Sequence, residues 1–273
     1  MTQSKNPSIA YDPWQHLSQF TPARIALGRT GMSLPTRANL DFQLAHALAR
    51  DAVHIPLDFT QLNQQLNQLG FKTQILQSQA ENDAMYLQRP DLGRLLCQGS
   101  LAELQAQPPL AVDAVIIIAD GLSSKAIEHH AVHFIELLLP ALQTKAYQIP
   151  PLCLVKQGRV AIGDAIAEHY QARFCILLIG ERPGLSSPDS MGIYFTYQAQ
   201  AGISTDADRN CISNIHSNGL SYEQALKKLL FLIDGAEQLK LSGVSLKDET
   251  TEAGLNNQLE ANFLFSVQNT SQS

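Results

Sequence analysis

The sequence predicts an α/β fold, with a mostly parallel sheet and flanking helices, preceded by a mainly helical N-terminal region. Short apolar runs at residues 112–119, 151–155 and 174–179 are typical of strands buried on both faces. Helical patterns follow the first two runs, as expected of right-handed β–α–β units. Before residue 111 the apolar residues recur mainly at helical spacing. With 273 residues the chain can bury a substantial core without disulfides or metals.

The N-terminal region is predicted to span residues 14–108, after a disordered lead at residues 1–13. Pro35-Thr36 offers a helix start, and the helix is expected to continue to about Val53. This region is interpreted as a helical cap on the sheet. The apolar residues on one face of its first helix are Leu40, Leu44, Ala47 and Leu48.

Three more elements are expected in this region. A helix over residues 59–69 ends at Gly70, because glycine commonly terminates helices. A short strand-like run follows at residues 71–76. Another helix is predicted from Pro90-Asp91 through Leu104.

The sheet region is predicted to span residues 109–247. Ser123-Ser124 caps a helix ending near Lys145, and a second helix covers residues 165–170. Residues 191–197 form a further strand, expected at an antiparallel edge because no helix-length crossover precedes it.

The end of the chain is predicted to hold a loop, a helix and a tail. The loop covers residues 206–216, and the capping box Ser221-x-x-Gln224 then opens the final helix. Residues 248–273 form a flexible tail. The apolar stripe of the final helix consists of Ala225, Leu229, Leu232, Ile233 and Ala236.

The composition excludes several classes of protein. The net charge of −6 and the lack of a Lys/Arg cluster argue against nucleic-acid binding. No apolar run approaches the ~20 residues of a membrane span, and no secretory signal is present, so a cytoplasmic location without membrane contact is expected. Charged residues make up 16% of the chain and apolar ones 45%, which hints at a surface covered by a partner.

The four cysteines indicate neither a disulfide framework nor a zinc site. No two of them form a Cys-x-x-Cys pair, which favours reduced, individually placed thiols. They are Cys97, Cys153, Cys175 and Cys211.

Ligands of open α/β sheets bind beyond the carboxyl ends of the strands. The candidate loops are therefore residues 120–124, 157–160 and 180–187. No Gly-x-Gly-x-x-Gly or phosphate-loop pattern follows a strand, which disfavours ordinary nucleotide binding. The loop from Gly180 to Pro188 contains two glycines and two prolines, so it is pre-shaped and exposes backbone donors to a broad polar ligand.

Glu181 and Asp120 each allow two interpretations. Glu181 could accept hydrogen bonds from a ligand, or it could form an ion pair with Arg182 or Arg159, which is slightly favoured on the residues alone. Asp120 could be a general base, but Asp-Gly after a strand is more commonly a turn.

The remaining candidates do not form a catalytic set. Cys211 lacks an activating neighbour and is not predicted to be a nucleophile. The His129-His130-x-x-His133 pattern lacks a carboxylate partner, so a solvated helix face is favoured over a metal site. No Ser/His/Asp order appears. The residues thus indicate a protein that holds a ligand, without catalytic residues of its own.

Six sequence blocks occur in order between about Phe20 and Lys247, and together they resemble one family. The resemblance is to the small (light) subunit of adenosylcobalamin-dependent ethanolamine ammonia-lyase. The blocks lie at residues 20–29, 89–94, 118–123, 158–160, 180–185 and 208–215, including Gly180-Glu-Arg-Pro-Gly184-Leu and Asp208-Arg209-Asn210-Cys211.

The resemblance implies a Rossmann-like, cobalamin-binding domain at residues 109–247. Base-on adenosylcobalamin would lie between this subunit and a large TIM-barrel subunit, which binds ethanolamine. The resemblance implies that cobalt–carbon homolysis would yield a deoxyadenosyl radical that abstracts a substrate hydrogen, with acetaldehyde and ammonia as the products. The small subunit would be inactive outside this hetero-oligomer.

The family's cobalamin contacts fall on Val160, Glu181 and Cys211. The resemblance makes Glu181 an acceptor for corrin amides, Val160 an apolar or backbone contact, and Cys211 a lining residue. Asn214-x-His216-x-x-Gly219 nearly matches the Asp-x-His-x-x-Gly motif that supplies histidine to cobalt in other cobalamin proteins. Because Asn replaces the orienting Asp and the implied cofactor is base-on, His216 is predicted not to be a ligand.

Two other functions compete with that of a cofactor-holding subunit, and the sequence also bears on the location of the protein in the cell. A stand-alone Rossmann-like nucleotide enzyme would need a phosphate-cradling glycine pattern, and a non-catalytic adaptor would make the loops incidental. Family members packaged in bacterial microcompartments carry a longer N-terminal extension. The short lead here therefore favours the cytoplasm over a microcompartment.

Overall fold

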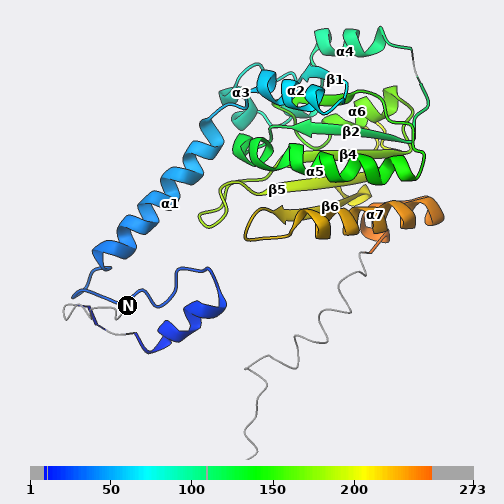
Figure 1. Ribbon diagram of the computed structural model, residues 1–273. Helices are drawn as coiled ribbons and strands as arrows, with labels where there is room; N and C mark the ends of the chain where they lie inside the picture. The colour runs from blue at the N-terminus through cyan, green and yellow to red at the C-terminus, as the bar shows by residue number, and fades with distance from the viewer. Residues whose placement is uncertain (1–8, 11, 109, 248–273) are drawn as a thin grey trace, which may run out of the picture.

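A six-stranded sheet forms the centre of the computed structural model, which describes residues 9–10, 12–108 and 110–247 (Figure 1). The strand order is β1-β3-β2-β4-β5-β6. The first four strands in this order are parallel, whereas β5 and β6 run antiparallel to their neighbours. The predicted mostly parallel sheet with flanking helices is confirmed. The strands are β1 (Thr73–Gln77), β2 (Ala114–Ala119), β3 (Leu152–Lys156), β4 (Phe174–Gly180), β5 (Met191–Tyr197) and β6 (Arg209–Ile215).

Helices lie along the chain between and before these strands. The α-helices are α1 (Thr36–His54), α2 (Phe59–Gln68), α3 (Asp83–Gln88), α4 (Gln98–Gln105), α5 (Ser124–Thr144), α6 (Ile162–His169) and α7 (Tyr222–Leu239). Short 3-10 helices are η1 (Pro13–Phe20), η2 (Leu92–Arg94), η3 (Asp206–Asp208) and η4 (Gly243–Ser245). Across the described residues, no helix combines the length and apolar character that a membrane crossing requires. The predicted tail at residues 248–273, and most of the predicted lead, lie outside the described residues.

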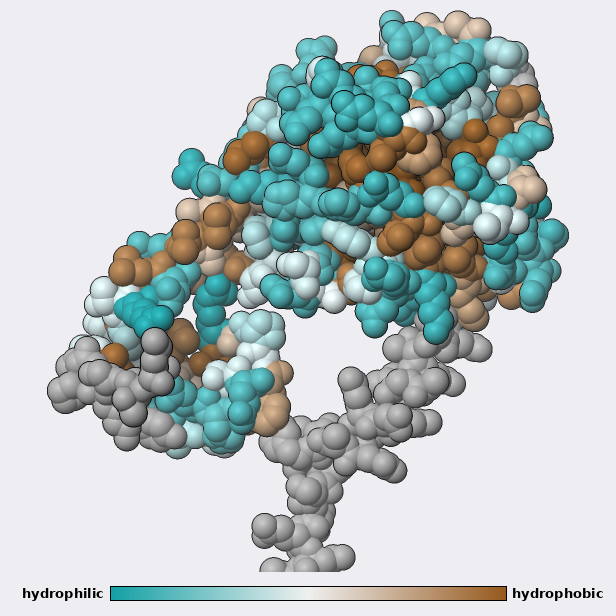
Figure 2. All heavy atoms as spheres, viewed as in Figure 1, coloured by the Kyte–Doolittle hydropathy of each residue, from teal (hydrophilic) through white to brown (hydrophobic). Residues whose placement is uncertain are grey.

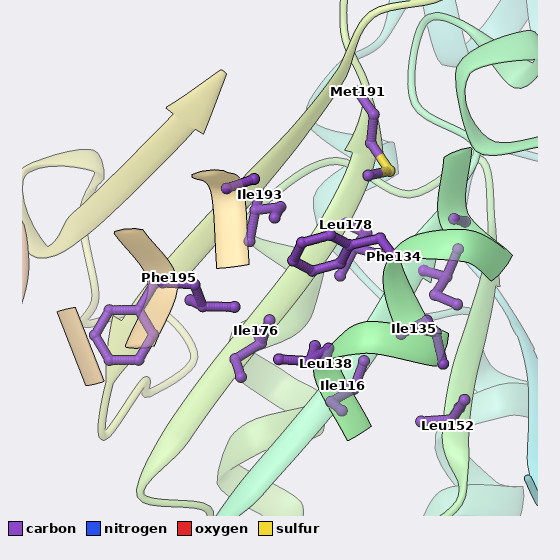
Figure 3. Packing of buried hydrophobic residues seen from close by; sticks show 14 of the residues in the cluster. Ile116, Phe134, Ile135, Leu138, Leu152, Ile176, Leu178, Met191, Ile193 and Phe195 are labelled. Atoms are coloured by element: carbon purple, nitrogen blue, oxygen red, sulfur yellow. The ribbon is translucent and has the colours of Figure 1, made fainter. Parts of the chain in front are cut away.

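The central strands are buried on both faces, as the apolar runs predict. All residues of β2 are buried, and they alternate between two cores. Ile116 and Ile118 face the core formed with α2, α5 and α7, while Val115 and Ile117 face the core formed with α6. In Figure 3, Phe134 of α5 packs among strand side chains of the first core. Its replacement by alanine would cost about 3–5 kcal/mol of stability.

Local capping signals place two helix starts correctly. The Ser123 hydroxyl accepts the Ala126 amide at the start of α5, and the capping box of Ser221 and Gln224 opens α7. The whole predicted apolar stripe of α7 is buried. These helices are therefore determined by short-range pattern.

The predicted helix from Pro90 through Leu104 is wrong. Residues 92–94 form η2, the chain then extends, and α4 begins only at Gln98. The extended segment pairs with the β1 region, because the Cys97 amide donates to the Gln77 carbonyl and the Gln79 amide donates to the Leu95 carbonyl. These pairings with β1, an edge strand of the sheet, override the local helical spacing.

The predicted loop at residues 206–216 is also wrong in part. It contains β6, which pairs with β5, so β5 is an interior strand and β6 is the edge. The segment looks polar because only one of its faces is packed, through Ile212 and Ile215. Tyr194 and Tyr197 of β5 do pack on opposite faces, as the alternation requires.

The first helix projects from the body as an arm (Figure 1). Of the residues of α1 only Ala52 is buried, and the main contact of α1 with the body is to α5. Leu40 and Leu44 are 57% and 61% exposed. Figure 2 shows apolar residues along this arm. The leucine stripe predicts a packed helix, but nothing in the part of the chain that the structure describes covers it.

Candidate functional site

The three candidate loops meet at the carboxyl edge of the sheet. The Gln157 amide donates to Oδ2 of Asp120 at 2.9 Å, which joins the loops after β3 and β2. The Leu122 amide donates to the Gly180 carbonyl at 2.9 Å, which joins the loops after β2 and β4. The predicted loops thus form one continuous edge.

Two glycines allow this close approach. Gly121 has φ +66°, and a Cβ there would lie 2.2 Å from the Gly180 carbonyl oxygen. A Cβ on Gly180 would lie 2.1 Å from the carbonyl oxygen of Ser123. Any side chain at either position would force the backbones apart.

Asp120 is a buried carboxyl group that braces these loops. Its two oxygens accept the backbone amides of Gly121 and Gln157. Burial raises its pKa to about 7, against the opposing effect of these hydrogen bonds. Because both carboxylate oxygens accept hydrogen bonds from backbone amides, Asp120 is better explained as a turn residue than as a general base.

Glu181 is held by hydrogen bonds and not by an ion pair. Its Oε2 accepts the Ser190 hydroxyl at 2.5 Å and the Asn214 amide at 3.1 Å. Its side chain lies over Gly192, where an added Cβ would be 2.9 Å from Oε1. Within the described residues Glu181 forms no ion pair with Arg182 or Arg159. The favoured interpretation from the residues alone is therefore wrong for this side chain.

Arg159 points into the fold. Its guanidinium lies 4.1 Å from the centre of the Tyr86 ring and donates to the Tyr86 carbonyl at 2.9 Å. Its amide donates to the Gly93 carbonyl at 2.7 Å, and the Tyr86 hydroxyl donates to the Gly158 carbonyl at 3.1 Å. These contacts fix the loop that carries Val160.

Val160, Glu181 and Cys211 lie toward the same face of the sheet. Val160 packs against the core that contains Ile179, and Glu181 follows Ile179 by two residues, so strand alternation places it on the same side. Cys211 is paired with Tyr194, which also packs against that core. The three residues that the resemblance selects therefore lie on one face of the sheet, although Val160 follows β3 and Cys211 lies on β6, with three strands between them.

This face is covered by α6 only in part. Helix α6 packs against β2 and β4, whereas α7 packs against β5 and β6 from the opposite face. Val160 and Glu181 are half-buried and Cys211 is exposed. An open hollow of about 550 Å³ lies beside Cys211 and is also lined by Asn214, Gly219 and Lys228.

The Cys211 thiol is suited to line a binding surface and not to act as a nucleophile. Partial desolvation and the negative charge of Glu181 raise its pKa, against an opposing hydrogen bond with Tyr194. The group is therefore a neutral thiol near pH 7, which is a poor nucleophile.

His216 uses both ring nitrogens within its own loop. Its Nε2 lies 2.8 Å from Oδ1 of Asn214, and its Nδ1 accepts the Asn218 amide at 3.3 Å. A Cβ on Gly219 would lie 2.3 Å from the Asn214 carbonyl oxygen, so the glycine permits this tight turn.

Several residues of this edge escape prediction from sequence. Ser190 and Asn214 hold Glu181 from nine and 33 positions away along the chain. Asp189 contacts His129, 60 positions away, and supplies the carboxylate that the histidine pattern lacks. No local sequence pattern predicts these partners. The alternation of side chains along β5 does predict that Tyr194 lies on the face that carries Val160.

Comparison of the sequence with known proteins identifies its family. Residues 11–247 match the ethanolamine ammonia-lyase light chain family. The chain is 50% identical over 267 residues to an ethanolamine ammonia-lyase small subunit of Pseudomonas fluorescens (strain Pf0-1), covering 95% of this chain and 97% of the relative. It is 50% identical over 247 residues to the protein of that name from Azotobacter vinelandii, covering 89% and 91% of the two chains. This chain belongs to the ethanolamine ammonia-lyase light chain family.

Proposed function

We propose that this chain holds adenosylcobalamin against the large subunit of ethanolamine ammonia-lyase, through a Rossmann-like sheet to which residues 109–247 contribute β2 to β6 and the N-terminal region contributes β1. The observation that carries the proposal is the placement of Val160, Glu181 and Cys211 on one partly uncovered face of the sheet. The domain contributes a binding surface and no catalytic residue.

The chemistry of this face suits a corrin ring with amide side chains. Glu181 uses Oε2 for its internal hydrogen bonds, and within the described residues no donor is bound to Oε1. Oε1 can therefore accept from a ligand amide. Val160 offers an apolar contact, and the neutral Cys211 thiol offers a small surface without charge.

The engagement of His216 supports a base-on cofactor. A histidine that ligates cobalt must direct one nitrogen at the metal, and here both nitrogens have partners within residues 214–218. The lower cobalt position would then be left to the cofactor's own base.

The large subunit is the proposed partner for the exposed arm. The relatives are named small subunits, which implies a larger companion chain. Leu40, Leu44 and Leu48 are exposed on α1 at helical spacing. Arg24, in the segment before α1, donates to the Leu185 carbonyl at 3.2 Å, so the arm region reaches the loop that follows Glu181. A partner on the arm would therefore adjoin the proposed cofactor face.

The cofactor, the large subunit and this chain have different roles. When bound, adenosylcobalamin supplies the radical chemistry that converts ethanolamine, held by the large subunit, to acetaldehyde and ammonia. This chain orients the cofactor through Glu181 and excludes water through Val160 and Tyr194. We expect it to be inactive alone, and its location in the cytoplasm, with a microcompartment as the alternative, stays a prediction.

An omission experiment tests the proposal. The chain, the large subunit and adenosylcobalamin are mixed, and acetaldehyde is measured with each component left out in turn. Activity is expected only from the complete mixture. Activity from this chain without the large subunit would indicate a stand-alone enzyme. Full activity without this chain would indicate an adaptor.

A further inference from the structure

We propose that His129, His130 and Asp189 form a binding site for a divalent transition metal of the zinc class. The two histidines lie on α5, and Asp189 lies in the loop between β4 and β5. This site does not depend on the proposed cobalamin face: α5 packs on the other side of the sheet, although Asp189 adjoins Ser190, which binds Glu181.

The three ligand atoms converge. Nδ1 of His129 lies 3.1 Å from Oδ2 of Asp189, and Nε2 of His130 lies 3.6 Å from the same oxygen. All the ligand atoms lie within 4.8 Å of one another. Neighbouring ligands of a tetrahedral zinc with bonds of ~2.0–2.1 Å are about 3.3 Å apart. The two distances from the histidines to Asp189 bracket this separation, and the two histidine nitrogens lie within 4.8 Å of each other.

One ring nitrogen of His130 has no hydrogen-bond partner among the described residues. The residue is buried, with 5% exposure, and this nitrogen is Nε2, which has the Asp189 carboxylate as a charged neighbour. At 3.6 Å, Asp189 is too far away for a hydrogen bond but correctly placed as a fellow ligand. A buried polar atom without a partner is costly, and a metal ion between His130 and Asp189 would remove that cost.

Tyr222 fixes the orientation of the same ring. The other nitrogen of His130, Nδ1, lies 2.7 Å from the Tyr222 hydroxyl. A proton on Nδ1, donated to that oxygen, leaves the Nε2 lone pair facing Asp189. Metal-bound histidines characteristically use their second nitrogen in this way.

The residues that carry the proposed ligands are held in place by packing and by a hydrogen bond. Ile127 and Ala131, which adjoin His130 on α5, are fully buried. The loop of Asp189 is tied to the start of α5, because the Ser123 hydroxyl donates to the Pro188 carbonyl at 2.8 Å. A metal here would fasten that loop to α5 a second time.

The set leaves room for a further ligand. His129 and Asp189 have side chains that are 51% and 26% exposed, so a metal would be reachable from solvent. Three protein ligands with a water in the fourth position are typical of open zinc sites. His133, the third histidine of the helix, pairs instead with Glu136 at 3.4 Å and lies outside the cluster.

Metal titration of the full chain without a histidine tag tests the proposal. Cobalt(II) serves as the spectroscopic probe, and zinc competition gives the affinity. One site per chain is expected. Asp189→Asn and His129→Gln should each weaken zinc binding at least ten-fold, and Tyr222→Phe should weaken it about ten-fold through loss of ring orientation.

His133→Gln is the matched control, since it removes a histidine of the same helix outside the cluster. It should bind zinc as the unmodified chain does. Circular dichroism should show each variant folded. Absence of saturable cobalt or zinc binding by the unmodified chain would overturn the proposal. So would undiminished binding by folded Asp189→Asn, or an equal loss in His133→Gln.

Discussion

The carboxylate of Glu181 accepts the backbone amide of Asn214 at 3.1 Å, which joins the loop after β4 to the end of β6. Two strands that are not neighbours are thereby linked across β5. The Glu181 carboxylate has two roles. Its Oε2 accepts hydrogen bonds from Ser190 and Asn214 within the fold, whereas Oε1, beside Gly192, is the proposed acceptor for the ligand.

Replacing Glu181 by glutamine should weaken adenosylcobalamin retention with the fold intact. The single carbonyl oxygen of glutamine would serve Ser190 and Asn214, which leaves an amide nitrogen toward the ligand. A loss of about ten- to one-hundred-fold is expected, since a hydrogen bond to a charged group contributes about 1.5–3 kcal/mol. Equilibrium dialysis of the reconstituted enzyme measures it.

Glu103→Gln, an exposed change on α4, is the control and should leave retention unchanged. If the Glu181 variant retained the cofactor equally well, its carboxylate would only support the loop.

Replacing Cys211 by alanine should leave activity of the reconstituted enzyme nearly unchanged. Its raised pKa keeps the thiol neutral, so no nucleophile is lost. Cys211→Trp should instead lower cofactor retention strongly, because a large ring at this exposed position would project into the proposed cofactor face. Acetaldehyde assays and dialysis separate the two effects. A large loss of activity in the alanine variant would show that the thiol takes part in the chemistry.

Asp164→Asn should destabilise the chain by about 3–5 kcal/mol, because it leaves a buried guanidinium without its countercharge. Asp164 and Arg209 form two hydrogen bonds of 2.6 and 2.7 Å, and their side chains are 4% and 3% exposed. Urea unfolding measures the change.

Asp206→Asn provides the comparison for this pair. Asp206 lies 3.7 Å from the same arginine but is 95% exposed, so its loss should cost no more than about 1 kcal/mol. Equal effects of the two substitutions would contradict the assignment of the buried pair.

Asp120 should make stability fall as the pH rises from about 4 to above 7. An unfolded aspartate titrates near pH ~3.9, whereas burial raises the pKa of Asp120 to about 7. Between these values the folded state binds more protons than the unfolded state, so the stabilisation is complete below pH ~4 and lost through about pH 7. At ~1.4 kcal/mol per pKa unit, the loss amounts to about 4 kcal/mol.

Urea unfolding of Asp120→Asn from pH 5 to 8 checks this dependence. The variant should show a flatter pH profile than the unmodified chain, since a neutral amide does not titrate. Asp41→Asn, on the exposed face of α1, should retain the original slope. If the pH profile of the Asp120 variant ran parallel to that of the unmodified chain, other titratable groups would be responsible for the slope.

The leucine stripe of α1 should be required for assembly and not for folding. Changing Leu40, Leu44 and Leu48 together to glutamine should weaken binding of the large subunit more than ten-fold, while the melting temperature stays nearly constant. These side chains are already exposed in this chain. Analytical ultracentrifugation with the large subunit measures the association.

Asn39→Ala and Arg50→Ala, on another side of the same helix, should not affect assembly. Unchanged association of the leucine variant would place the interface elsewhere.

The sequence by itself determined the central strands and the capped helices. Ile116 and its neighbours are apolar without alternation, which requires burial on both faces of a sheet. Ser123 and Ser221 cap helices through hydrogen bonds to residues three positions away. Such signals are local, so no knowledge of the rest of the fold is needed. The family motifs likewise selected Val160, Glu181 and Cys211.

Tertiary structure decided the elements and partners that depend on distant residues. Leu95 is extended because its backbone pairs near β1, and β6 is a strand because β5 offers a partner to its polar sequence. Asp189 joins the histidines of α5 across 60 positions. A hydrogen bond or a packed face needs both of its partners, and when they lie far apart in the chain only the fold brings them together.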